Sequence, residues 1–136
     1  MKPLLVMSLL LAACDTSMEP SRKPIVHAAL NVPFTLDAGQ SAILDDEELS
    51  VTFVRVLEDS RCPIDATCIY AGDATMSIRA VLQGQAAMTL NLTISAGANA
   101  VYEGFGFHAQ QLLPGQLTGH TIPPADYDVQ LLVDRP

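Results

Sequence analysis

The chain is 136 residues long and acidic, with 15 Asp and Glu residues against 7 Lys and Arg residues and a formal net charge of −8 at pH 7. An acidic surface repels phosphate backbones and anionic lipid headgroups. The composition therefore argues against a nucleic acid partner, and attachment to a membrane must come from something other than positive charge.

Residues 1–13 have the layout of an export signal. Lys2 places one positive charge ahead of an apolar run from Leu4 to Leu11 that only Ser8 interrupts, and secretory signals have this order of features. A helix needs about 20 predominantly apolar residues to cross a bilayer, and Asp15 follows too soon for that. We therefore expect a cleaved signal and not a transmembrane anchor.

The end of this signal predicts a lipoprotein. The tetrapeptide Leu11-Ala12-Ala13-Cys14 resembles the bacterial lipobox, in which a Leu and two small residues precede a cysteine. In proteins with that motif the thiol receives a diacylglyceryl group, and two or three acyl chains anchor a protein stably. The alternative is a secreted protein whose Cys14 lies in the signal by chance. We expect a lipid anchor on a bacterial membrane, inner or outer, with the domain outside the cytoplasm.

Cleavage before Cys14 would leave 123 residues, which is 136 minus 13. Residues 14–24 are rich in Ser, Pro and charged residues and have little to bury, so we expect a flexible tether. Removal of Lys2 with the signal leaves 6 basic and 15 acidic residues, a formal charge of −9 (6 minus 15). The remaining residues 25–136 suit one domain with one core.

Residues 25–136 are dominated by alternation of apolar and polar residues with a period of two, which predicts strands. The runs lie too close together for βαβ crossovers, so we expect mostly antiparallel pairing. The expected fold is all-β, a single antiparallel β-sandwich or partly open barrel of about seven strands. The runs are Phe34–Leu36, Ser41–Leu44, Leu49–Leu57, Ala74–Leu82, Met88–Ile94, Val101–Leu113 and Tyr127–Asp134.

Turn residues separate these runs. Asp37–Gln40 predicts a hairpin loop, because Gly39 can supply the positive φ that such turns need, and a second turn falls at Gln83–Gln85. We expect residues 114–124 to be irregular because they combine Gly with Pro. Arg55 intrudes on the apolar face of its strand.

Two cysteines remain if Cys14 is lipidated, and Cys62 and Cys68 enclose five residues. Outside the cytoplasm thiols are usually oxidised, so we expect a disulfide, which would remove roughly 2 to 2.5 kcal/mol of unfolded-chain entropy. A catalytic thiol would need an unpaired cysteine. Zinc is the other alternative, but the spacing differs from the Cys-x2-4-Cys of structural zinc sites, so we expect no metal and no other cofactor. The histidines that could complete a zinc site are His27, His108 and His120.

The most distinctive motif surrounds these two cysteines. Asp59-Ser60-Arg61-Cys62-Pro63 is followed, after a short spacer, by Cys68-Ile69-Tyr70-Ala71-Gly72-Asp73-Ala74. Upstream lies Phe34-x-Leu36-x-x-Gly39-Gln40, and near the end lies Tyr127-x-Val129-x-Leu131. Together these motifs resemble a group of small exported bacterial proteins, many of them lipoproteins, over nearly the whole of residues 25–136. The resemblance implies the β fold and the disulfide, and it supplies no activity.

Tyr70 stands where that group has Trp. If the ring binds a ligand, the substitution changes the binding site. If the ring packs against the disulfide, Tyr serves nearly as well, with its hydroxyl seeking a partner. Packing is the role that we expect.

Asp45–Glu48 places four carboxylates between two expected strands. Oxygen ligands of this kind bind hard cations such as Ca²⁺, but the run lacks the spacing of an EF-hand. A solvated turn that also discourages edge aggregation is the expectation.

Two hypotheses for function remain. The first is a noncatalytic binding or envelope-associated module that contacts a protein, glycan or small ligand, with Arg61, Pro63 and Tyr70 in the candidate binding loop. No nucleophile is paired with a base in the sequence, so we expect no enzyme, although a partly buried cluster of Asp, His or Arg side chains would reopen that question. The alternative is a protease inhibitor in which the disulfide-closed loop 61–68 presents Arg61 as the specificity residue.

Overall fold

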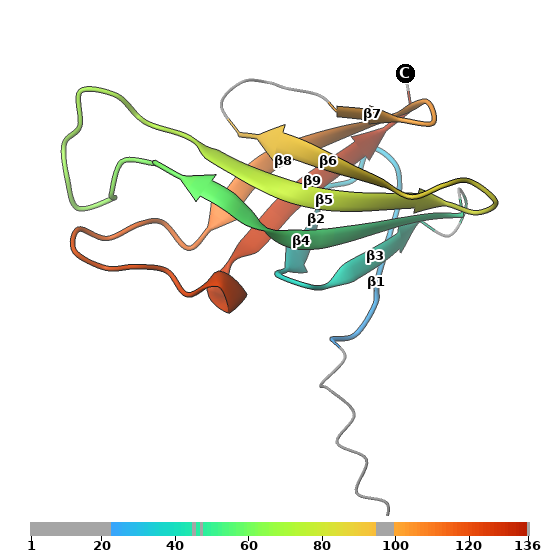
Figure 1. The fold of residues 1–136 in the computed structure, drawn as a ribbon, viewed down its shortest axis with the longest axis horizontal. Helices are drawn as coiled ribbons and strands as arrows, with labels where there is room; N and C mark the ends of the chain where they lie inside the picture. Colours follow the sequence, from blue (N-terminus) through green and yellow to red (C-terminus); the bar gives the residue numbers. More distant parts are fainter. Residues whose placement is uncertain (1–22, 45, 47, 95–99, 136) are drawn as a thin grey trace, which may run out of the picture.

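The computed structural model describes residues 23–44, 46, 48–94 and 100–135. The expected signal, Cys14 and most of the expected tether lie outside these residues. The described part contains no helix of the length and apolarity needed to cross a bilayer. It forms nine strands and a short 3-10 turn, arranged as two facing sheets (Figure 1).

The first sheet has the strand order β1–β3–β4–β5–β6, and the second has the order β2–β9–β8–β7. Neighbours in the described sheets pair antiparallel, except β1 and β3, which are parallel. This confirms the expected all-β, sandwich-like fold, and the sheets do not close into a barrel. The elements are β1 (Val26–Ala28), β2 (Phe34–Asp37), β3 (Ser41–Leu44), β4 (Leu49–Asp59), β5 (Ala74–Leu82), β6 (Met88–Thr93), β7 (Ala100–Tyr102), β8 (Phe105–Leu113), the 3-10 turn η2 (Pro124–Asp126) and β9 (Asp128–Asp134).

The core lies between the sheets and follows the predicted alternation. Every second residue from Ala74 to Ala80 is buried in β5, and Val129, Leu131 and Val133 are buried in β9. Full burial of a large apolar side chain contributes about 1.5–3 kcal/mol. The largest fully buried side chains include Phe53, Phe105, Phe107, Leu36, Leu44, Leu49, Met76, Ile78 and Leu92.

The strand count differs from the expectation of about seven for two reasons. The run Val101–Leu113 is two strands, because Glu103 and Gly104 both have positive φ and form a two-residue hairpin that pairs Tyr102 with Phe105. Such turns match the twist of the flanking strands. The other addition is β1, which is too short to produce a visible alternation.

The turn at Asp37–Gln40 exists, but the predicted hairpin is wrong. The φ of Gly39 is +83°, yet β2 pairs with β9 and β3 pairs with β4, so the turn carries the chain from one sheet to the other. The Gly39 N–H donates to the Phe53 carbonyl (2.7 Å), and the Phe53 N–H donates to the Gln40 carbonyl (3.0 Å). The turn residues are thereby bonded to β4 in the first sheet.

Two bulges in β4 explain why Arg55 does not enter the core, although the alternation assigns it to the apolar face. The pairing of β4 with β5 shifts register between Phe53 and Arg55 and again between Val56 and Glu58. A bulge redirects the side chains that follow it, so Arg55 is exposed while Val56 packs against the core. The strand then continues to Asp59, where the site described below begins.

Candidate functional site

Two long loops extend side by side beyond one end of the sheets (Figure 1). We call them together the tip, which comprises residues 60–73 between β4 and β5 and residues 114–123 between β8 and η2. The Ile64 N–H donates to the Gln116 carbonyl (2.9 Å). The Asp65 carboxylate accepts from the N–H and the hydroxyl of Thr118 (2.9 Å each). These bonds join the two loops, although more than 50 residues separate the partners in sequence.

The first loop is closed by the expected disulfide. Cys62 and Cys68 are bonded, with their Cα atoms 5.9 Å apart. The Cys62 N–H donates to the Ala71 carbonyl (2.8 Å), and the Ser60 N–H donates to the Asp73 carbonyl (2.7 Å). The disulfide therefore closes a segment whose stem is already held by backbone hydrogen bonds.

An ion pair between Asp59 and Arg61 lies at the base of the tip. The Arg61 Nε donates to Asp59 Oδ1 (2.7 Å), and Nη2 donates to Oδ2 (2.8 Å). The guanidinium also donates to the carbonyls of Leu112 (2.6 Å) and Pro114 (2.9 Å), where β8 enters the second loop. The side chains are 6% exposed for Asp59 and 18% for Arg61. One arginine thus joins the end of β4 to the end of β8.

Two further residues complete this cluster, which we call the clamp. The Tyr127 hydroxyl donates to Asp59 Oδ2 (2.9 Å), and the Gln116 side-chain amide donates to the Asp59 carbonyl (3.0 Å). Burial raises the pKa of the Asp59 carboxyl, but the hydrogen bonds from Arg61 and Tyr127 and the charge of Arg61 outweigh it and lower the pKa to about 2. Burial and the hydrogen bond to Asp59 raise the pKa of Tyr127 to about 12.

The clamp is the kind of partly buried Asp and Arg cluster that would reopen the question of an enzyme. A general acid or base works best when its pKa lies near the working pH. Asp59 is ionised and Tyr127 is protonated across the neutral range, and the Arg61 donors are directed at Asp59 and at backbone carbonyls. This arrangement suits the positioning of loops better than proton transfer.

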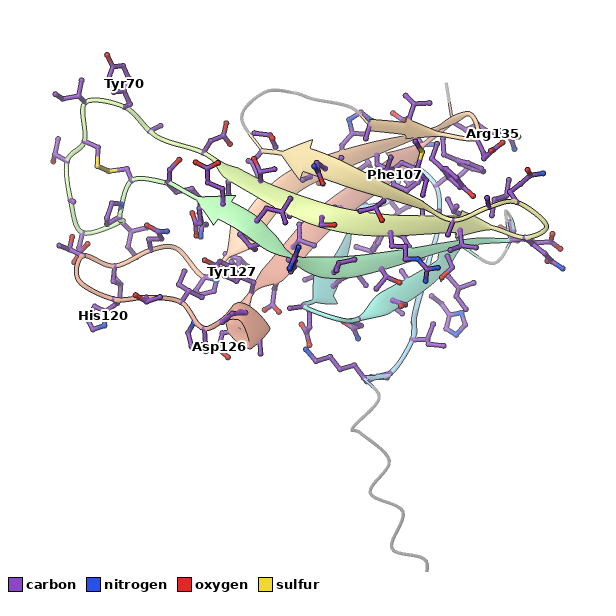
Figure 2. The ribbon with its side chains drawn as sticks, in the orientation of Figure 1. Tyr70, Phe107, His120, Asp126, Tyr127 and Arg135 are labelled. Carbon is purple, nitrogen blue, oxygen red and sulfur yellow. A yellow bond between two sulfur atoms is a disulfide. The ribbon has the colours of Figure 1, made fainter. Side chains whose placement is uncertain are left out.

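Three large apolar side chains of the tip are exposed to solvent. Ile69 is 93% exposed, Tyr70 is 83% exposed and Ile64 is 74% exposed. Figure 2 shows the Tyr70 side chain pointing away from the body of the molecule. The expectation that Tyr70 packs against the disulfide is therefore wrong. The clamp and the disulfide hold the loop without help from its ring.

Arg61 lies apart from the other residues of the candidate binding loop. Pro63 is half-buried beside the disulfide and Tyr70 is exposed, whereas the Arg61 guanidinium is turned into the clamp. A trypsin-like protease would need that guanidinium to be presented. The placement removes the reason to expect Arg61 as a specificity residue.

The residues considered for metals do not come together. Cys62 and Cys68 are bonded to each other, and His108 Nε2 lies 2.9 Å from Asp134 Oδ2 on the second sheet. The described residues contain no group of three or more His, Cys, Asp or Glu side chains that could hold a metal ion. In the acidic run, Asp45 and Glu47 lie outside the described residues.

A shallow hollow of about 380 Å³ lies beside the clamp, where β8 meets the tip. It is lined by Arg61, Ile64 and Gly115 of the tip, by residues 110–113 of β8 and by Ile94 after β6. A larger hollow of about 580 Å³ lies near Lys23 and β3, away from the clamp. The hollow beside the clamp borders the tip, so a partner bound there could contact both.

Comparisons with protein-family models, with curated proteins and with solved structures find no match to this chain. The resemblance carried by the cysteine motif stays a prediction.

We expect Asp59→Asn to flatten the acid dependence of stability. The folded-state pKa of Asp59 lies below its ordinary value of 3.8, at about 2. The contribution of the ionised carboxylate to the free energy of unfolding is therefore fully present above pH 3.8 and is lost as the pH falls through about 2. That contribution is about 2 kcal/mol. The free energy of unfolding, measured by urea denaturation from pH 7 to pH 2, should fall more steeply for the native chain than for Asp59→Asn. As a control, Glu103→Gln removes a carboxylate in the hairpin between β7 and β8. Equal slopes of the free energy of unfolding against pH for the native chain and Asp59→Asn would contradict the clamp.

Gly72→Ala should be far more damaging than Gly84→Ala. Both glycines have positive φ, +70° and +80°, which costs other residues roughly 1–2 kcal/mol. A Cβ at Gly72 would also overlap the Ser60 carbonyl oxygen, whereas one at Gly84 meets nothing within 4 Å. We expect a loss of about 1 kcal/mol for Gly84→Ala and roughly 3 kcal/mol for Gly72→Ala in urea denaturation. Equal losses would show that the Ser60–Asp73 stem is not rigid.

Proposed function

We propose that the protein is a lipid-anchored component of the bacterial cell envelope whose domain is a noncatalytic binding module, with the tip as its recognition surface. The acylated Cys14 holds the protein at a membrane, and residues 25–136 lie outside the cytoplasm. The lipobox-like Leu11-Ala12-Ala13-Cys14 supports the anchor. The disulfide between Cys62 and Cys68 supports an oxidising compartment, since such bonds are rare in the cytosol.

The observation that carries the proposal is the exposure of Ile64, Ile69 and Tyr70 on a loop that the disulfide and hydrogen bonds to the second loop hold in place. Burial of side chains of this size contributes about 1.5–3 kcal/mol each. A loop closed by a disulfide and bonded to its neighbour loses less entropy on binding than a mobile one. Exposed apolar groups on a rigid support are the form that interaction hot spots take.

The charge around the tip favours a protein partner with an apolar pocket and a neutral or basic rim. Asp65 and Asp73 flank the apolar residues, and the Arg61 charge is paired with Asp59. The net charge of the chain opposes insertion among anionic headgroups. A tether of about ten residues reaches at most roughly 35 Å, so the partner lies in or near the same membrane.

Replacement of Cys14 by Ala should abolish lipidation. Cells that express the native chain or Cys14→Ala are fed an alkyne-labelled fatty acid, and the protein is purified and coupled to a fluorophore. We expect label on the native chain and none on the variant, which should also leave the membrane fraction. Equal labelling of the two proteins would contradict the anchor and leave the proposal for the tip standing.

Recognition by the tip can be tested by photocrosslinking in living cells. Replacement of Tyr70 by the photoreactive p-benzoylphenylalanine should give one discrete protein adduct, because the side chain lies in the proposed contact. The same replacement at Gln85, an exposed turn residue, is the matched control and should give none. Adding Ile69→Ser should weaken the adduct at position 70 at least about tenfold, which corresponds to 1.4 kcal/mol.

Three results would contradict the proposal that the tip is a recognition surface. They are crosslinking to phospholipid, equal adducts at positions 70 and 85, and an adduct that Ile69→Ser does not change. The first would show that the tip contacts the membrane itself. The other two would show collision without specific contact.

A further inference from the structure

The free edges of the two sheets differ in how well they are protected. A sheet edge exposes backbone N–H and C=O groups that can pair with another chain, and natural proteins shorten, bend or block such edges. The outer strands β1, β2 and β7 are three or four residues long. Beyond β7, the edge of β8 is bent by a register shift between Ala109 and Gln111, and Arg61 donates to the Leu112 carbonyl.

Strand β6, which spans Met88–Thr93, has none of these protections within the part of the chain that the structure describes. It is the outer strand of the first sheet, and it pairs with β5 without a register shift. It contains no Pro, and no Asp, Glu, Lys or Arg occurs anywhere in residues 80–102. Leu90 and Leu92 are buried in the core, so the strand is firmly attached to the sheet.

The backbone groups that β6 leaves open can be identified. The Ile94 N–H donates to the Ala74 carbonyl (3.1 Å), and in an antiparallel pair the residues that bond a given neighbour alternate. Leu92 and Leu90 therefore bond β5, while the N–H and C=O groups of Thr89, Asn91 and Thr93 point away from the sheet. Within the described residues no other backbone group is bonded to these outward groups.

We infer that a second copy of this chain pairs with β6, antiparallel and about a two-fold axis. The three open residues are spaced evenly around Asn91, so Asn91 faces its counterpart and Thr89 faces Thr93 of the second copy. Each facing pair exchanges two backbone hydrogen bonds. Two acidic chains repel each other, but β6 and the sequence on either side of it, residues 80–102, carry no charge, so the pairing strands themselves bring no like charges together. The two five-stranded sheets become one continuous sheet.

Disulfide trapping tests this register in the full-length, membrane-bound protein. The Cα atoms of a facing, hydrogen-bonded pair lie about 5.5 Å apart, within the 4.4–6.8 Å range of disulfides. Asn91→Cys should therefore form a disulfide-linked dimer after mild oxidation. Thr89→Cys should not, because two copies of residue 89 lie about 13 Å apart in this register. Co-expression of Thr89→Cys with Thr93→Cys should restore crosslinking to at least about tenfold above Thr89→Cys alone.

A charge substitution gives an independent measurement that does not depend on cysteine chemistry. Asn91→Lys places two like charges directly opposite each other across the pairing, which is destabilising. In sedimentation velocity of the full-length protein in detergent, the native chain should be dimeric and Asn91→Lys monomeric. Gln85→Lys adds the same charge in the turn before β6 and should stay dimeric. Circular dichroism spectra that match for the three proteins would establish that each is folded.

The inference is overturned if the native chain sediments as a monomer and Asn91→Cys crosslinks no more than Thr89→Cys. It is also overturned if Asn91→Cys traps a different protein, because the occupant of the edge would then not be a second copy. Neither result bears on the recognition tip, whose residues lie in other segments.

Discussion

The arrangement of the tip depends on the ion pair between Asp59 and Arg61. A buried ion pair repays the cost of desolvation only when the geometry is good and the remaining polar atoms are bonded. Here the two Asp59 oxygens accept from Arg61 and Tyr127, and the guanidinium also bonds the Leu112 and Pro114 carbonyls. These partners come from both sheets, so the clamp fixes the end of the sandwich where apolar packing stops.

The clamp also explains why large apolar side chains at the tip can remain in solvent. A loop usually keeps its shape by burying its own side chains. In this loop the disulfide, the stem between Ser60 and Asp73 and the bonds to the second loop supply that shape with polar and covalent contacts. The loop therefore keeps its shape without burying Ile69 and Tyr70, and their exposure is compatible with a stable fold.

The sequence predicts features that depend on local pattern and misses those that depend on distant pairing. Alternation identifies the buried faces of β5 and β9, and the cysteine count identifies the disulfide. The sequence of the turn at Gly39 does not distinguish a hairpin from a crossing between sheets, because the turn conformation is the same whether the next strand stays in the sheet or leaves it. The bond from Tyr127 to Asp59 spans 68 residues. Its partners could not be paired without knowing that the end of β4 lies beside the start of β9.

The proposed contacts occupy separate parts of the sandwich, and the topology is the reason. The described chain begins at the β1 edge of the first sheet, and β6 is the opposite edge of the same sheet. The tip extends beyond the ends of β4, β5 and β8 (Figure 1). Pairing through β6 would leave the β1 edge open, so the proposed tether could still run to a membrane. Because that pairing is antiparallel, the two tips would lie at opposite ends of the shared sheet, and each could bind its own partner.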